Sequence, residues 1–213
     1  MLKVKPPPEY PPEEGHYVRG NDYSPVAVVA LLNAPYEKIP PEIERLVKVS
    51  VEAGAALAGT LQTANIGLEK IVANLVANPN IRYMILCGTE VQGHKSGEGV
   101  KALFQNGIDS RRVIKGTTAP TSYLFNIPVE AIERFRKQVR LLDLMTVADP
   151  EEVRKAVWSC YQENPTEFQS YTLSDPGAYP EPPICCKITW RIKKPELIED
   201  WEIEDILKEV ENK

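Results

Sequence analysis

The chain has 213 residues, a length that suits one domain with a substantial core or one domain with appendages. Charged residues (26%) and hydrophobic residues (43%) occur at ordinary globular levels, and no apolar run is long enough for a transmembrane helix. The last eighteen residues carry eight acidic and two basic side chains, a net charge of −6, so the remaining chain carries +1. A nearly neutral body offers no broad surface for nucleic acid.

The N-terminal segment, residues 1–16, contains five prolines between Pro6 and Pro12 and predicts an extended arm. It has no apolar stretch typical of a secretory signal, so we expect a cytoplasmic protein. His16, at the end of the arm, is expected to be solvated. The four cysteines form no C-x-x-C pair and are expected to be reduced.

Strands and helices alternate over residues 24–160, which predicts an α/β fold, a Rossmann-like three-layer sandwich with a mainly parallel sheet. The expected strands are residues 24–32, 82–87, 112–115 and 139–144. The expected helices begin near Pro41 and cover residues 66–77, 96–105 and 129–137, with a last one opening at Asp149. Residues 60–65 are expected to form a polar turn, with Asn65 as the N-cap of the helix that follows. Glu69 and Lys70 are expected to be solvated charges on a helix surface.

The predicted α/β domain spans residues 17–162, and its C-terminal extension, residues 163–213, begins with a polar, proline-rich stretch. Residues 184–192 predict an added edge strand. Residues 200–210 predict an acidic amphipathic helix, with Ile203, Ile206, Leu207 and Val210 on one side. We expect this extension to pack on or beside the domain and the helix to cover a sheet edge.

The segment from Gly88 to Ser96 reads GTEVQGHKS and follows a predicted strand. It is close to the phosphate-binding pattern G-x-x-x-x-G-K-[ST], but His94 stands where the lysine belongs. A nucleotide-binding α/β protein using this loop is therefore one hypothesis.

His94 supports a second hypothesis, in which it is a metal or cofactor ligand, because neutral imidazole is the usual protein donor to transition metals. No second histidine is near, and Glu90 and Glu98 are the only close carboxylates. The metal would therefore have to arrive with a cofactor that supplies its other donors.

Three strings occur together: SPVAVV at residues 24–29, TANIGLEKIVAN at residues 63–74 and NIRYMILCGTEVQGH at residues 80–94. With them the chain resembles the A subunit of tetrahydromethanopterin S-methyltransferase, an archaeal corrinoid protein of methanogenesis. The resemblance implies a methyltransferase component whose cobalamin cobalt accepts a methyl group from a methylated pterin and passes it to a thiol such as coenzyme M. Partner subunits would supply the methyl donor and the thiol acceptor.

The resemblance also implies a site. His94 would be the lower axial ligand of the cobalt, at the C-terminal edge of the parallel sheet, with Gln92 in place of the aspartate usual in corrinoid proteins. The implied cofactor-binding residues are Thr63, Asn65, Gly67, Gly88, Thr89, Glu90, Val91, Gly93, Gly97 and Thr117. The family's C-terminal membrane anchor has no counterpart here, which predicts a soluble homologue without a direct membrane span.

Overall fold

The computed structural model describes residues 2–35, 37–192, 194 and 197–211, and its centre is a five-stranded sheet. The strand order is β1-β3-β2-β4-β5, parallel throughout except for β1, which pairs antiparallel with β3. The strands are β1 (Tyr17–Arg19), β2 (Val26–Leu31), β3 (Leu57–Leu61), β4 (Tyr83–Gly88) and β5 (Arg140–Met145). Strands β6 (Thr166–Phe168) and β7 (Tyr171–Leu173) form a separate hairpin.

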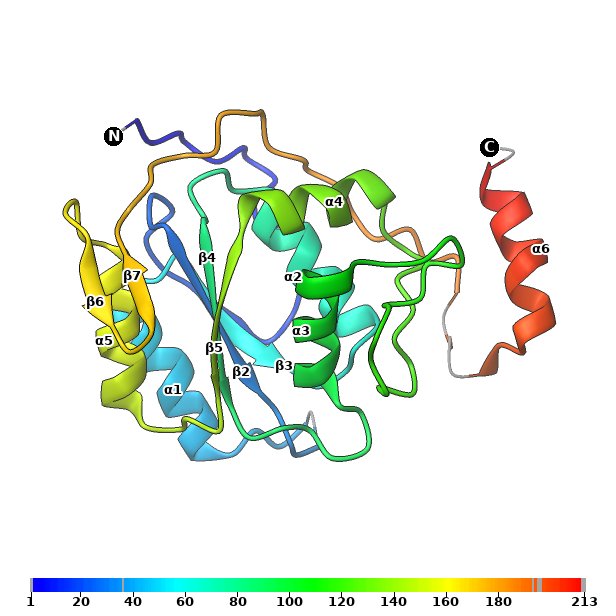
Figure 1. Cartoon of the computed structure of the whole chain (residues 1–213), viewed down its shortest axis with the longest axis horizontal. Helices are drawn as coiled ribbons and strands as arrows, with labels where there is room; N and C mark the ends of the chain where they lie inside the picture. Colours follow the sequence, from blue (N-terminus) through cyan, green and yellow to red (C-terminus); the bar gives the residue numbers. More distant parts are fainter. Residues whose placement is uncertain (1, 36, 193, 195–196, 212–213) are drawn as a thin grey trace.

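Helices cover both faces of the sheet, with α1 and α5 on one side and α2, α3 and α4 on the other (Figure 1). Their bounds are α1 (Pro41–Glu52), α2 (Ile66–Val76), α3 (Ser96–Asn106), α4 (Val129–Gln138) and α5 (Pro150–Cys160). Every residue of β2 and β4 is buried, as expected of central parallel strands packed on both faces. The predicted α/β class with a mainly parallel sheet is confirmed, whereas the finer Rossmann-like assignment stays a prediction.

Strand β3 corrects the sequence prediction, which placed a polar turn over residues 60–65. Its sequence, LAGTL, has the low strand propensity of alanine and glycine. The small residues are needed because β1 approaches closely: a Cβ at Gly59 would lie 2.7 Å from the Cβ of Tyr17. The predicted strand over residues 112–115 forms only the isolated bridges Ile108–Ile114 and Val113–Tyr123.

The predicted edge strand over residues 184–192 is wrong. This segment makes single hydrogen bonds to loops and helix ends, from Ile184 N to Val76 O (3.1 Å) and from Thr189 N to Asn126 O (3.1 Å). The acidic helix is confirmed as α6 (Asp200–Glu211). It covers no sheet edge, because Ile203 packs with Phe125 and Ile192 and the helix stands away from the sheet (Figure 1).

The N-terminal arm and the segment from Asp175 to Cys186 run side by side across the N-terminal edge of the parallel strands (Figure 1). Lys3 and Asp175 form an ion pair at 2.6 Å between them. The Asn80 side chain holds the arm through two hydrogen bonds to the Val4 backbone. Its Oδ1 accepts from Val4 N (3.0 Å), and its Nδ2 donates to Val4 O (2.6 Å). One edge of the sheet is thereby covered, and the opposite, C-terminal edge holds the loops that carry the site.

Candidate functional site at the C-terminal edge of the sheet

The loop after β4 lies at the point where the strand order changes direction. The chain passes from β2 outward to β3 and then returns to β4 on the other side of β2. Open α/β sheets bind their ligands at such a point, beyond the carboxyl ends of the strands. Asn33, just after β2, accepts a hydrogen bond from Gln92 N at 3.2 Å and so joins the two loops that flank this point.

Glu90 holds the loop in shape by capping α3 with its side chain. Its carboxylate accepts hydrogen bonds from the N–H groups of Val91 (2.7 Å), Gly97 (2.9 Å) and Glu98 (2.8 Å). These are the groups that a phosphate-binding loop would offer to an anion. A carboxylate already satisfies them, so the loop lacks the free cradle that the nucleotide hypothesis requires.

Lys95 does not take the place of a phosphate-binding lysine either. Its ammonium donates to the Thr118 hydroxyl and lies 3.9 Å from Glu98 Oε2. Glu98 in turn accepts from Thr118 N and from the Thr117 hydroxyl (3.1 Å). These hydrogen bonds, with the Lys95 charge, lower the pKa of Glu98. The group fastens the loop around Thr117 to the first turn of α3.

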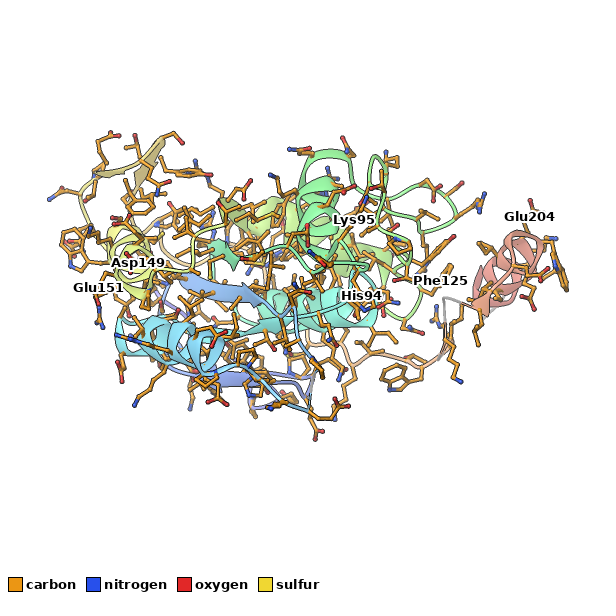
Figure 2. The ribbon with its side chains drawn as sticks, turned by 90° about the horizontal axis from the view of Figure 1, so that it is seen from below. His94, Lys95, Phe125, Asp149, Glu151 and Glu204 are labelled. Carbon is orange, nitrogen blue, oxygen red and sulfur yellow. The ribbon has the colours of Figure 1, made fainter. Side chains whose placement is uncertain are left out.

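His94 is the only imidazole in the loop. The imidazole is partly exposed, and no hydrogen bond or ion pair joins it to another residue in the described part of the chain. Its neighbour Gly93 has a φ of +83°, and a Cβ there would meet no atom within 4 Å. Figure 2 looks onto this edge and shows His94 near its middle, well away from Asp149 and from Glu204 of α6. The site therefore offers a free nitrogen donor beside open space.

The turn between β3 and α2 comes directly against α3. A Cβ on Gly99 would lie 2.9 Å from the Cβ of Ala64 and 3.9 Å from that of Ala119. The three chain segments that contain the predicted site residues thus meet at one edge. Thr63 and Asn65 hold the turn itself, since their side chains accept from Gly67 N (3.2 Å) and Ile66 N (2.8 Å). The predicted cap at Asn65 is confirmed.

Several predicted cofactor residues have a structural role instead of an exposed position. Gly88, at φ +89°, lets the strand pass the Leu31 backbone, and a Cβ on Gly97 would lie 2.8 Å from the Met145 methyl. Val91 is buried in the core. The predicted residues that remain at least partly accessible are Thr63, Gly67, Thr89, Glu90, Gly93, His94 and Thr117. The prediction missed Asn33, although a polar residue directly after a buried strand is a usable signal.

Glu69 corrects a second prediction, because it is buried rather than solvated. Its carboxylate accepts from Asn126 N (2.7 Å) and Asn126 Nδ2 (3.1 Å). Burial raises its pKa to about 7, against the opposing effect of the Asn126 bonds. Asn126 Oδ1 also accepts from the N–H groups of Arg191 (2.9 Å) and Ile192 (3.0 Å). Glu69 and Asn126 together fasten the C-terminal extension to α2.

Within the described ranges, no three His, Cys, Asp or Glu residues lie close enough to hold a metal ion. Cys87 and Cys160 are buried and form no disulfide, and burial raises the pKa of each thiol to about 12. Both side chains lie in the core, so neither thiol is accessible from the His94 loop.

Comparison with known proteins identifies the family to which these segments belong. The family model for the A subunit of tetrahydromethanopterin S-methyltransferase (MtrA) matches residues 3–191. The chain belongs to this family. The A 1 subunit from Methanothermobacter thermautotrophicus is 43% identical over 81% of this chain and 69% of its own length. The A 2 subunit of the same organism is 41% identical over 88% of this chain and 92% of its own.

A third relative, the A subunit from Methanocaldococcus jannaschii, is 40% identical over 87% of this chain and 69% of its own length. The predicted family is therefore confirmed, and membership supports a role in methyl transfer. The family match ends at residue 191, before α6. No helix in the described part of the chain has the length and hydropathy needed to cross a bilayer. The expected cytoplasmic location stays a prediction.

Proposed function

We propose that the chain is a corrinoid-binding methyl carrier, working with partner subunits that supply a methylated pterin and a thiol such as coenzyme M. The observation that carries this proposal is His94, an unbonded imidazole beside open space at the switch point of the sheet. Family membership supports the methyl-transfer role, and the corrinoid and its ligand are the added proposal.

The residues around His94 fit a corrinoid. No three His, Cys, Asp or Glu residues of the described chain lie close enough to hold a metal ion, so a metal at His94 would have to bring most of its donors, as cobalt does within a corrin. A flat macrocycle also needs room beside the residue that would hold it. Gly93, next to His94 in the chain, leaves its own position open, since a Cβ there would meet no atom within 4 Å.

The bound corrinoid would supply a cobalt able to accept and release a methyl group. The contribution of the chain is to bind that cofactor, to place one nitrogen ligand and to keep the loop from collapsing. Glu90 does the last of these through its three hydrogen bonds to the backbone. Glu98, Thr117 and Lys95 fix the neighbouring loop that would border the macrocycle.

No carboxylate is hydrogen-bonded to His94 among the described residues, which agrees with Gln92 in place of an aspartate. A carboxylate bonded to the far nitrogen of a histidine ligand normally raises its basicity and fixes its orientation. We therefore expect His94 to bind cobalt more weakly than a carboxylate-assisted histidine and to exchange readily.

The experiment is an absorption and electron paramagnetic resonance titration of the full chain with cobalamin. The expected result is a spectrum with a histidine nitrogen below the cobalt, together with loss of that signature in His94→Ala. The matched control is Asn164→Ala, an exposed polar residue just before the β6–β7 hairpin, outside both the His94 loop and the α2 cavity. Absence of binding at micromolar cobalamin, or an unchanged signature in His94→Ala, would falsify the proposal.

A further inference from the structure

A cavity of about 200 Å³ lies between the sheet and α2, apart from the His94 loop. None of its lining residues comes from the segment after β4, but Thr63 and Gly67, two of the predicted cofactor-binding residues, line it, so the cavity adjoins the candidate site from the side of α2. Its walls are mainly apolar, formed by Ala27 and Val29 of β2, Leu57 of β3, and Ile71 and Leu75 of α2.

The roof of the cavity is the segment from Glu13 to Tyr17, and it is held firmly. Asn74 bonds both the N–H (2.8 Å) and the C=O (3.0 Å) of Glu13, and Lys70 Nζ donates to Glu14 O at 3.0 Å. Thr60 N donates to His16 O at 3.1 Å, which continues the pairing of β1 with β3. A cavity with a fixed roof persists in the folded protein and is a preformed binding site.

His16 gives this cavity its polar group. It lines the cavity, and its Nδ1 is buried without a hydrogen-bond partner among the described residues. A buried polar atom that lacks a partner destabilises the fold, so such atoms are uncommon unless a ligand or water provides the missing hydrogen bond. The sequence prediction that His16 is solvated is wrong at this atom, because the arm folds back on the sheet.

We propose that this cavity binds one planar heteroaromatic ring system of up to two fused rings, whose nitrogen edge pairs with His16 Nδ1. The size fits, since a dry cavity of about 150 Å³ accommodates a benzene ring. The slot lies between a sheet and a helix and is lined by aliphatic side chains, which suits the faces of a flat ring. Lys70 also lines the cavity, so a cation is available to an anionic group attached to the ring.

Two sources carry such a ring: a free base in solution, or the benzimidazole base on the nucleotide tail of a corrinoid. With the second source the proposal rests on the proposed function, since His94 must first replace that base below the cobalt. The first source requires nothing of the cobalt site.

The test uses the fact that the chain has only two histidines. In the full chain labelled with ¹⁵N, the imidazole signals of His16 report on the cavity and those of His94 on the cobalt site. Three probes are compared: 5,6-dimethylbenzimidazole, cobinamide, which lacks the nucleotide and its base, and cobalamin. The free base is expected to shift His16 alone and cobinamide His94 alone. Cobalamin is expected to shift both if its own tail occupies the cavity, and His94 alone if a free base is the occupant.

Ile71→Trp fills the cavity, and Ile43→Trp is the matched control, a partly buried isoleucine of α1 on the opposite face of the sheet. Filling is expected to weaken binding of the free base at least about tenfold, the factor that ~1.4 kcal/mol gives, while the control binds as the wild type does. The proposal is overturned if the free base leaves His16 unshifted, or if it binds Ile71→Trp as tightly as wild type. Failure of cobinamide to shift His94 would remove the proposed function and leave the cavity proposal standing.

Discussion

Two polar centres of this chain, the His94 loop and the buried pair Glu69–Asn126, differ in how far their hydrogen bonds are satisfied. Asn126 uses its side-chain oxygen and nitrogen and its backbone groups, and both oxygens of Glu69 accept. His94 has no hydrogen-bond partner among the described residues and is partly exposed, next to the open position at Gly93. A saturated, buried pair stabilises the fold, whereas an unsatisfied, accessible donor is available to a ligand.

The largest expected effect is on stability, at Glu69. Glu69→Ala leaves two buried Asn126 donors unpaired and is expected to lower the free energy of unfolding by about 3–5 kcal/mol. His94→Ala removes no described contact and is expected to change it by less than about 0.5 kcal/mol. Urea unfolding followed by circular dichroism measures both. Equal losses in the two variants would end the distinction between the two centres.

The pH dependence of stability sharpens the same contrast. The pKa of Glu69 is raised from 4.5 to about 7, chiefly by burial, so between these values the folded protein binds more protons than the unfolded chain. The free energy of unfolding is therefore expected to fall as pH rises through this window, by up to about 3 kcal/mol, and to level off above it. Urea midpoints from pH 4.5 to 8 measure the slope. Glu69→Gln is expected to flatten it, and a slope that survives the substitution would assign it to other groups.

Glu90 lies in the accessible His94 loop, yet its carboxylate accepts three hydrogen bonds from backbone N–H groups, as a buried structural carboxylate does. Glu90→Ala removes the acceptor of three N–H groups and is expected to lower the free energy of unfolding by about 1–2 kcal/mol. Glu130, an exposed acidic residue in the first turn of α4 without a capping bond, is the matched control, and Glu130→Ala should have little effect. If both alanine variants lose the same stability in thermal unfolding, Glu90 contributes only charge.

The smallest expected effect concerns α6, which the Glu69–Asn126 pair anchors through the adjoining segment. Ile203 is fully buried against Phe125, so Ile203→Ala should loosen α6. The global free energy of unfolding should change by less than about 0.5 kcal/mol, since a peripheral helix opens locally. Limited proteolysis and Trp201 fluorescence follow the loosening. Leu197→Ala, at a side chain that is 67% exposed, is the control, and equal proteolysis of the two variants would contradict this docking.

The sequence by itself was enough for the central strands and for the helices over α2, α3 and α4. Continuous apolar runs and local caps such as Asn65 carry their own signal, because the partners lie within a few residues. The motif around His94 likewise identified the family, since its unusual spacing is local in the chain.

Tertiary structure alone decided the features that depend on distant partners. Strand β3 is small-residue rich and exists because β1 lies against Gly59, a contact between residues about forty positions apart. Glu69 reads as a surface charge until Asn126, 57 positions away, buries and satisfies it. His16 Nδ1 is shielded from solvent because Asn74 and Lys70 hold the arm onto the sheet. The local sequence pattern indicates which secondary structure and which degree of burial a residue favours. Long-range packing decides whether the residue adopts them in the folded protein.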